Sequence, residues 1–257
     1  MEKRKYSALY RHIAKLHDGR PWGELLDAGA GTSSLRWISS LKTERWTGVT
    51  GSESHAKKIR KEIAGMQRPQ DKLIVANWAD TNLLKNEEFD TVIADYLLGA
   101  IEGFAPYFQS HLFPRLRPLT KGWLYITGCE PYVPQRQPKD KAAKIVWEIG
   151  RYRDACVLLA GDRPYREYPA HWVVNQLENA GFKVTNVKHF NIRVKERFIN
   201  GQIDLCKPAL NMLKDIDLAN ALLSRGETLR AEALALLKDE DGVLRTGKDY
   251  VIAAKPR

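Results

Sequence analysis

The sequence is poor in cysteine and contains no long apolar run. Its three cysteines are far apart and form no CxxC pair, so neither a zinc knuckle nor a disulfide framework is predicted, and we expect no metal site. No window approaches the roughly 18 consecutive apolar residues of a transmembrane helix, and residues 1–17 lack the apolar core of a signal peptide. We therefore expect a cytoplasmic protein with reduced, structural cysteines and no membrane partner. The cysteines are Cys129, Cys156 and Cys206.

Acidic side chains are in deficit. The 257 residues include 41 Lys and Arg against 31 Asp and Glu, which gives a formal net charge of +10. Such an excess favours anionic partners, such as RNA or a phosphorylated substrate, through its long-range field. The positive charges are scattered along the chain and interleaved with Glu and Asp, however, as they are on an ordinary solvated surface. Nucleic-acid binding is therefore the less favoured alternative.

Short strand-like segments alternate with longer helical ones in the first half of the chain. Parallel strands need a connection long enough to return along the sheet, and a crossover helix supplies it. The alternation therefore predicts an α/β fold with a mostly parallel sheet. The strand-like segments are ELLDAG, WTGVT, KLIVANW, FDTVIADY and GWLYITG, and the helices between them are expected at 33–41, 54–65 and 105–117.

Other segments flank this alternating region. An amphipathic helix is predicted at 6–16, followed by a turn with Gly and Pro. Residues 131–170 contain five prolines around a helical stretch at about 140–160, which indicates an insertion or lid. The segment HWVVNQLENAG predicts another amphipathic helix and FKVTNVKHFNI a strand. Two more helical segments are expected within 204–238, and KDYVIAAKPR closes the chain as a strand.

A glycine-containing loop follows the first of these strands, in the segment LLDAGAGTSSLRW. Gly29 and Gly31 would let the backbone approach a ligand closely, and the helix after them offers free N–H groups. The third glycine of the dinucleotide fingerprint GxGxxG is replaced by Ser34, which disfavours a pyrophosphate site. An ordinary strand-to-helix turn is the alternative.

An acidic residue lies at or just after the end of four predicted strands. These are Asp27, Glu53, Asp80 and Asp95, and Glu53 lies 22 positions beyond Gly31, where an acid would bind ribose hydroxyls. The carboxyl ends of parallel strands line one edge of a sheet, where open α/β folds bind their ligands. We therefore expect the four acids to converge on one crevice.

In combination these segments resemble the class I S-adenosylmethionine-dependent methyltransferases, in particular their small-molecule branch. The matching segments are LLDAGAGTSS, VTGSESHAKKIRKEI, NWADTNLLKNEEFDTVIADYLL, HWVVNQLENAGFKVTNVKHF and KDYVIAAKP. The resemblance implies a Rossmann-like methyltransferase fold, with a mostly parallel seven-stranded sheet and helices on both faces. It implies a single domain over 1–257, with an N-terminal cap helix at 1–20, a lid insertion at 131–170 and a helical insertion at 191–245 before the last strand.

The resemblance also implies S-adenosyl-L-methionine as the cofactor. Asp27 and the two glycines would lie at its methionine portion, Glu53 at the ribose and Asp80 at the adenine amine. Ser33 replaces the third glycine of the family's common GxGxG, and Thr50 competes with Glu53 for the ribose position. The implied cofactor-binding residues are Asp27, Gly29, Gly31, Thr32, Glu53, Asn77, Trp78, Asp80, Asp95 and Tyr96.

Methyl transfer from a sulfonium is an in-line displacement, so the protein mainly aligns the two partners and excludes water. An O or N nucleophile can also need a base. Asp95 and His171 are the candidate catalytic residues. The alternatives are that Asp95 only binds the cofactor and that His171 is an ordinary helix-start residue.

The acceptor is expected to be a small molecule. The fourth strand ends in ADYLLG rather than in the Asn or Asp followed by Pro-Pro-aromatic of amino-methylating enzymes. Aromatic and arginine side chains in the lid segment suit an enclosed site for a molecule with a carboxylate or phosphate, although they could simply pack the lid. RNA or a ribosomal protein as acceptor, a non-catalytic cofactor-binding protein, and a homodimer stay open. The expected substrate-binding residues are Tyr6, Tyr10, Trp147, Arg151, Asp154, Arg166 and Tyr168.

Overall fold

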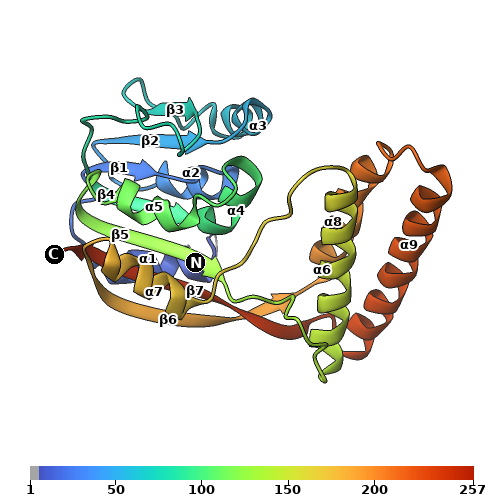
Figure 1. Cartoon of the computed structure of the whole chain (residues 1–257). Helices are drawn as coiled ribbons and strands as arrows, with labels where there is room; N and C mark the ends of the chain where they lie inside the picture. Colours follow the sequence, from blue (N-terminus) through green and yellow to red (C-terminus); the bar gives the residue numbers. More distant parts are fainter. Residues whose placement is uncertain (1–5) are drawn as a thin grey trace. The chain divides into compact units, whose positions relative to one another are not determined.

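The computed structural model describes residues 6–257, which form two compact units (Figure 1). The first, which we call the sheet unit, comprises the chain up to Cys129 together with 168–190 and 250–257. The second, the helical unit, comprises 130–167 and 191–249.

The segments of the helical unit overlap in sequence with the insertions expected at 131–170 and 191–245. The lid role expected for the first of these stays a prediction. Residues 1–5 of the expected cap helix lie outside the described residues.

The sheet unit is built on a seven-stranded sheet with the order β3-β2-β1-β4-β5-β7-β6 (Figure 1). β1 pairs in parallel with β2 and β4, β2 with β3, and β4 with β5. This confirms the predicted α/β fold with a mostly parallel seven-stranded sheet. The strands are β1 (Glu24–Asp27), β2 (Arg45–Thr50), β3 (Lys72–Val75), β4 (Phe89–Asp95), β5 (Thr120–Cys129), β6 (Phe182–Val194) and β7 (Leu244–Pro256).

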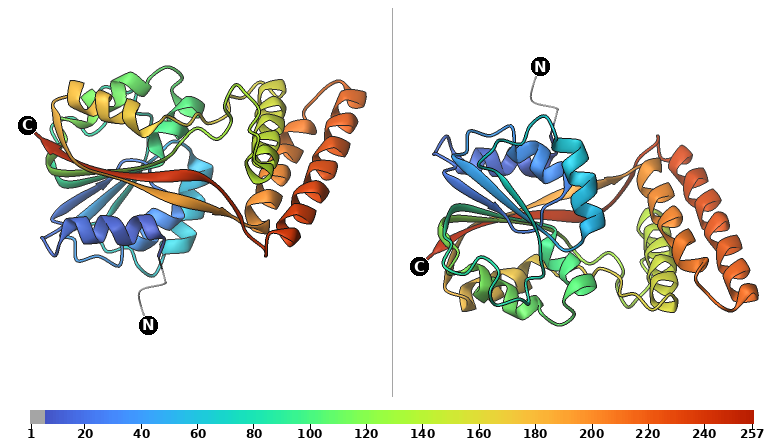
Figure 2. Two further views of the ribbon diagram at one scale, coloured as in Figure 1. Left: turned by 90° about the horizontal axis from the view of Figure 1, so that it is seen from below. Right: turned by 90° about the horizontal axis from the view of Figure 1, so that it is seen from above.

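Helices cover both faces of this sheet, as predicted (Figure 2). α1, α2 and α3 pack on one face around a buried cluster that includes Ile13 and Leu35. α4, α5 and α7 pack on the other face around Phe113 and Val173. The helices are α1 (Ala8–His17), α2 (Thr32–Ile38), α3 (Glu53–Ile63), α4 (Leu97–Phe104), α5 (Gln109–Leu116) and α7 (Ala170–Asn179).

Two of these helices begin at serine caps. The Ser7 hydroxyl accepts a hydrogen bond from the Tyr10 N–H, and that of Ser52 accepts one from the His55 N–H, each at 3.2 Å. A cap of this kind pairs one of the N–H groups that a helix start leaves unsatisfied. α1 ends at Asp18, whose left-handed φ of 54° stops the helix.

The helix expected at 105–117 corresponds to α5, and α4, which ends before that segment, was not predicted. Pro106 and the surrounding residues separate them, because proline has no N–H to continue a helix. α4 has the sequence LLGAIEGF and follows the apolar strand β4 almost directly, so its helical periodicity is hidden in a continuous apolar run.

The helical unit packs three helices, α6 (Lys141–Leu159), α8 (Glu196–Leu210) and α9 (Ile216–Asp239), around its own apolar cluster. α8 begins eight residues before the segment in which helices were expected. A Cβ at Gly226 would lie 2.4 Å from the Tyr152 hydroxyl, so the glycine allows α9 to approach α6 closely.

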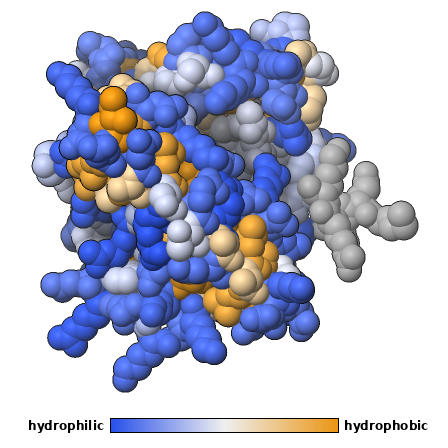
Figure 3. Space-filling model, turned by 90° about the vertical axis from the view of Figure 1, so that its right-hand side faces the viewer, coloured by the Kyte–Doolittle hydropathy of each residue, from blue (hydrophilic) through white to orange (hydrophobic). Residues whose placement is uncertain are grey.

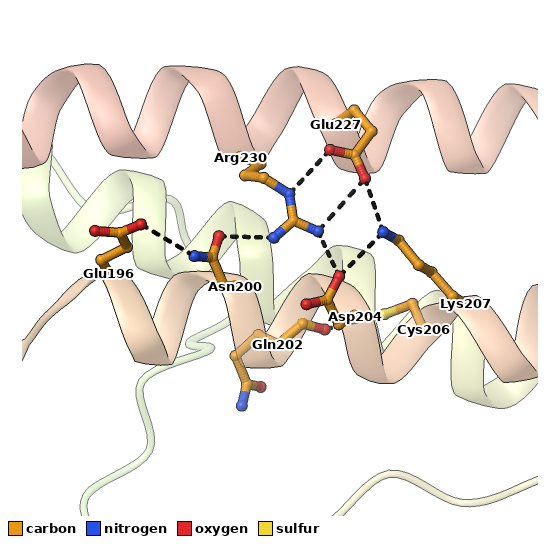
Figure 4. A network of polar contacts seen from close by, with 8 residues as sticks. All are labelled: Glu196, Asn200, Gln202, Asp204, Cys206, Lys207, Glu227 and Arg230. Atoms are coloured by element: carbon orange, nitrogen blue, oxygen red, sulfur yellow. Dashed lines mark hydrogen bonds and ion pairs between the residues drawn. The ribbon is translucent and has the colours of Figure 1, made fainter.

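A network of charged side chains joins α8 to α9 (Figure 4). Arg230 contacts Asn200 at 2.6 Å, Asp204 at 2.7 Å and Glu227 at 2.9 Å, and Lys207 contacts the same two acids. Single exposed pairs contribute little, so the network's main effect is to fix the alignment of the two helices.

The surface in Figure 3 is mainly hydrophilic, with small separate apolar patches. No helix within residues 6–257 is long and apolar enough to cross a bilayer.

The central strand β1 offers a test of the core. Leu26 is fully buried between β2 and β4, whereas Val75 lies on the edge strand β3 and is 37% exposed. We expect Leu26→Ala to lower the free energy of unfolding by about 2–5 kcal/mol, because it leaves a cavity. Val75→Ala, the control, should cost less than about 1 kcal/mol. Urea denaturation measures both, and equal losses would contradict this placement of the core.

Candidate functional site

The carboxyl ends of β1, β4 and β5 bring three polar side chains to one edge of the sheet. Asp27 ends β1, Asp95 ends β4, and Thr127 lies beside Asp95 in the register of β5. Asp27 is opposite Ile93 of β4, so the two acids are on adjacent strands. Two of the four acids expected at this edge, Asp27 and Asp95, therefore end adjacent strands, and their expected part in ligand binding stays a prediction.

Asp27 is fully buried and only partly hydrogen-bonded. One of its oxygens, Oδ2, accepts a hydrogen bond of 2.6 Å from the Ser34 hydroxyl, which itself accepts one from the Gly31 N–H. The other oxygen, Oδ1, has no hydrogen-bond partner among residues 6–257. Burial raises the pKa of Asp27 to about 7, and the nearby Asp95 carboxylate adds to the rise, while hydrogen bonding by the Ser34 hydroxyl and the Gly29 N–H opposes it.

Asp95 is partly buried, and both of its oxygens accept hydrogen bonds. The Tyr10 hydroxyl of α1 donates to Oδ2 at 2.6 Å, and the Thr127 hydroxyl donates to Oδ1 at 2.5 Å. Burial raises the pKa of Asp95, and these two hydrogen bonds partly oppose the rise. Burial and the Asp95 charge raise the pKa of Tyr10, so its hydroxyl stays a neutral donor.

Tyr10 is therefore part of this edge, but its side chain is almost inaccessible to solvent. It is 6% exposed, and its ring stacks on Trp37 at a centroid distance of 4.7 Å. Its expected part in acceptor binding stays a prediction. Tyr6, expected in the same role, is partly buried and packs against the α1 side of the core.

The residue after Asp95 adopts a strained backbone. Tyr96 has a φ of 49° and is 41% exposed at the start of α4. A left-handed conformation is unfavourable for a bulky side chain and is found mainly where function or packing imposes it. Such a turn between β4 and α4 is consistent with a ligand-binding edge.

The two glycines of the β1–α2 loop differ in their surroundings. A Cβ at Gly29 would lie 3.0 Å from Leu97 Cβ and 3.3 Å from the Asp95 carbonyl oxygen, so this glycine lets the β1–α2 loop pack against the start of α4. A Cβ at Gly31 would meet only the Ser34 hydroxyl at 3.9 Å. Gly31 and the partly buried Thr32 at the start of α2 are thus the positions where a ligand would find space.

The turn after β3 carries the residues expected near adenine. The buried Trp78 donates its indole N–H to the Ala28 carbonyl oxygen at 2.7 Å, which connects this turn to the β1–α2 loop. Asn77 and Asp80 are exposed, and each accepts a hydrogen bond from a backbone N–H two residues later. Their expected roles in cofactor binding stay predictions.

The end of β2 is the weakest match to the expected cofactor site. Thr50, which has no charge, ends the strand and is 5% exposed. Glu53 begins α3 instead, where its exposed carboxylate forms an ion pair with Arg60 at 2.7 Å. Which of the two lies at the ribose stays open. A Cβ at Gly51, between them, would meet the Phe104 ring at 2.6 Å.

His171 and Tyr168, two more of the predicted site residues, lie at and just before the start of α7. His171 is exposed at the start of α7, and no hydrogen bond joins it to Asp95. Tyr168 packs on Trp172, with ring centroids 4.5 Å apart, and its carbonyl oxygen accepts a hydrogen bond from the Tyr250 hydroxyl.

The remaining predicted residues belong to the helical unit. Trp147 donates its indole N–H to the Pro134 carbonyl oxygen at 2.7 Å, and the Arg151 guanidinium lies 4.8 Å from the centroid of its ring. Asp154 pairs with the buried Arg153, and Arg166 is exposed.

Two residues of the site were missed from the sequence. Ser34 had been noted only as a missing glycine, yet its hydroxyl links Asp27 to the start of α2. Thr127 lies on a different strand from its partner Asp95, and only the strand pairing could have indicated it.

Comparisons with known proteins bear on the fold of the chain alone. No protein-family model matches the chain, and a search of curated proteins finds no match. Solved structures do match along most of the chain. A Bacillus halodurans C-125 protein, named provisionally as a methyltransferase, has 16% identity and a TM-score of 0.61 over 96% of this chain and 98% of its own. The chain has the class I methyltransferase fold.

Two further structures with this fold show how varied its uses are. A mycolic acid cyclopropane synthase, solved with S-adenosylhomocysteine (SAH) and CTAB, has 17% identity and a TM-score of 0.54 over 94% of this chain and 83% of its own. A [4+2]-cyclase has 16% identity and a TM-score of 0.52 over 96% and 80%. At these identities the likeness defines the fold of this chain, and its chemistry has to be argued from its residues.

The raised pKa of Asp27 predicts a pH dependence of stability. An unfolded Asp ionises near pH 3.9, whereas Asp27 in the folded protein ionises near pH 7. Between these values the folded state holds the extra proton, so this group lowers the free energy of unfolding as pH rises from about 4 to about 7. We expect Asp27→Asn to flatten the fall of Tm over that range. The control Asp80→Asn changes an exposed carboxylate and should leave the slope unchanged; identical profiles for both variants would contradict the assignment.

Proposed function

We propose that the chain is an S-adenosylmethionine-dependent methyltransferase that transfers a methyl group to an O or N nucleophile of a small molecule. The observation that carries the proposal is the pair of carboxyls at the ends of β1 and β4. Asp27 is fully buried and Asp95 partly buried, the pKa values of both are raised, and one Asp27 oxygen has no hydrogen-bond partner among residues 6–257. Such a pair is stabilised by a bound cation with N–H donors.

The residues present fit S-adenosylmethionine at most of the expected positions. Its ammonium group can supply the donor and charge that the Asp27 carboxyl lacks, and Gly31 and Thr32 leave space at the start of α2. Asn77 and Asp80 are exposed in the turn expected at the adenine. Only the β2 end departs, because Thr50 carries no charge and Glu53 would have to leave Arg60 to bind a ribose.

When bound, this cofactor supplies an electrophilic methyl group on a sulfonium. The chain's own contribution is to hold and orient the reactants and to exclude water. Both oxygens of Asp95 already accept hydrogen bonds, so we assign Asp95 a positioning role rather than that of a base. His171 stays the second candidate for a base, with a solvent-exposed ring.

The acceptor side is proposed to lie with the aromatic and arginine residues of the helical unit. Arg151 on Trp147 presents a cation over a flat ring, and Arg166 adds a second exposed guanidinium. These groups suit a small molecule that carries a carboxylate or phosphate. Asp154 is engaged with Arg153 and would act by holding that arginine.

A second candidate function is use of the same cofactor site without methyl transfer. This candidate is supported by the similar structure of a protein named as a [4+2]-cyclase. It is also supported by the sequence, since no residue of this chain is obligatory for methyl transfer.

Cofactor binding can be measured directly by isothermal titration with S-adenosylmethionine. We expect Asp27→Asn and Asp95→Asn each to weaken binding about tenfold or more, since each removes a charged hydrogen-bond acceptor. Affinity should rise from pH 6 to pH 8, because Asp27, with a pKa of about 7, must lose its proton to bind a cation.

A matched pair on α3 tests the ribose position. Glu53 and Glu62 are both exposed glutamates that form an ion pair with an arginine. Glu53 pairs with Arg60, and Glu62 pairs with Arg36. Glu53→Gln should weaken binding, and Glu62→Gln should not.

The proposal of a cofactor site as a whole would be overturned by absence of S-adenosylmethionine binding to the wild type, or by equal affinity of the wild type and Asp27→Asn.

The acceptor class is tested with methyl-labelled S-adenosylmethionine. We expect label to appear in a small-molecule fraction of a cell extract rather than in RNA or protein. Arg151→Ala should raise KM for the acceptor because it removes a cation, whereas Lys141→Ala, which removes another exposed cation of the same helix, should not. Label in RNA instead would favour the alternative acceptor, and no label despite cofactor binding would favour the non-transferring function.

A further inference from the structure

The α1 side of the sheet unit carries an excess of positive charge. The segments 8–20, 182–190 and 250–257 contain seven Lys and Arg and a single acid, Asp18. This is a far stronger bias than that of the whole chain, in which 41 basic residues face 31 acids. All three segments belong to the sheet unit. The fold therefore brings into one unit basic residues that are far apart in the sequence.

Contacts between α1 and β6 define one end of this surface. His12 of α1 lies 3.4 Å from the Asn186 side chain and packs edge-on against Phe190, with ring centroids 5.4 Å apart. The Lys188 ammonium lies 5.5 Å from the centroid of the same phenylalanine ring. Lys15 is exposed one turn further along α1.

Contacts between β5 and β7 define the other end. The partly buried Trp123 has the Arg20 guanidinium 4.4 Å and the Lys255 ammonium 5.9 Å from its ring centroid. Trp123 also stacks on Tyr125 with ring planes within 7°. A flat ring flanked by two exposed cations thus lies on this side of the sheet.

The cations of this surface are not neutralised within the described chain. Lys15, Arg20, Lys188 and Lys255 are exposed and form no ion pair with any residue of 6–257. Arg36, Arg45 and Arg60 elsewhere in the sheet unit are each paired with a glutamate, by contrast.

The electrostatic neighbours of His12 agree with this description. Burial lowers the pKa of His12, and the charges of Lys188 and Lys15 lower it further, against a hydrogen bond to Asn186. The two lysines, from β6 and α1, therefore act on the same point of the surface.

We propose that this basic face, made of Lys15, Arg20, Lys188 and Lys255 with the rings of His12, Trp123 and Phe190, binds single-stranded nucleic acid. Unpaired cations attract phosphates, and aromatic rings beside them offer stacking surfaces for unpaired bases. A lipid surface is a poorer match, because Val187 is the one large apolar side chain of 182–190 that is exposed.

This inference is independent of methyl transfer and needs no cofactor. The test is fluorescence anisotropy of the whole chain with a labelled single-stranded RNA of about twenty nucleotides, a length that exceeds one typical site. We expect binding that weakens steeply with salt, since each neutralised phosphate of a single strand contributes about −0.7 to the slope of log K against log salt.

A pair of double variants separates this face from the charge of the whole chain. Lys15→Gln with Lys188→Gln should weaken binding about tenfold and reduce the magnitude of the slope by about 1.4, for two lost phosphate contacts. Lys57→Gln with Lys58→Gln removes the same charge from exposed positions of α3, beside β2 and β3, and should change affinity less than about twofold. Phe190→Leu should weaken binding without changing the slope, because it removes stacking alone.

Three results would overturn the proposal. The first is no RNA binding at low salt. The second is equal effects of the two lysine pairs, which would assign binding to the net charge of the chain. The third is binding to anionic phospholipid vesicles, reduced by the Lys15 and Lys188 changes, without binding to RNA.

Discussion

Asp27 and Asp95 end adjacent strands at one edge of the sheet, and the structure has to accommodate two carboxyls where water is largely excluded. Like charges at short range in such surroundings repel each other strongly. Each acid is therefore fastened by hydroxyl donors from other elements: Ser34 of α2 for Asp27, and Tyr10 of α1 and Thr127 of β5 for Asp95. Three separate elements are thus aligned on this one edge, which connects the packing of the fold to its candidate chemistry.

The sequence predicted this edge because strand alternation and acid position are local properties. Asp27 and Asp95 could be placed from the apolar runs that precede them, and the seven strands followed from the same pattern. Ser34 and Thr127 could not be placed in the same way, because a hydrogen bond between elements far apart in the chain leaves no periodic mark. α4 was missed because its apolar residues continue those of β4 without a polar break.

Glu53 illustrates a different limit of sequence reasoning. Its distance from Gly31 suited a ribose ligand, but three positions separate it from the strand end at Thr50, and in that interval the chain has already started a helix. A count of residues cannot tell whether a side chain lies at a strand end or on the first turn of the next helix. The fold itself is equally permissive, since structures of similar architecture include a cyclopropane synthase and a [4+2]-cyclase. The residues at the edge carry the chemical argument.

The hydrogen bond from Tyr10 to Asp95 has a thermodynamic consequence. A ligand that takes the Oδ2 atom of Asp95 competes with a hydroxyl already held there by the stacking of Tyr10 on Trp37. The measured affinity then equals the intrinsic affinity multiplied by the fraction of molecules in which Tyr10 has released that oxygen. The stacking of Tyr10 on Trp37 therefore enters the affinity of any ligand at this oxygen, although neither ring would touch that ligand.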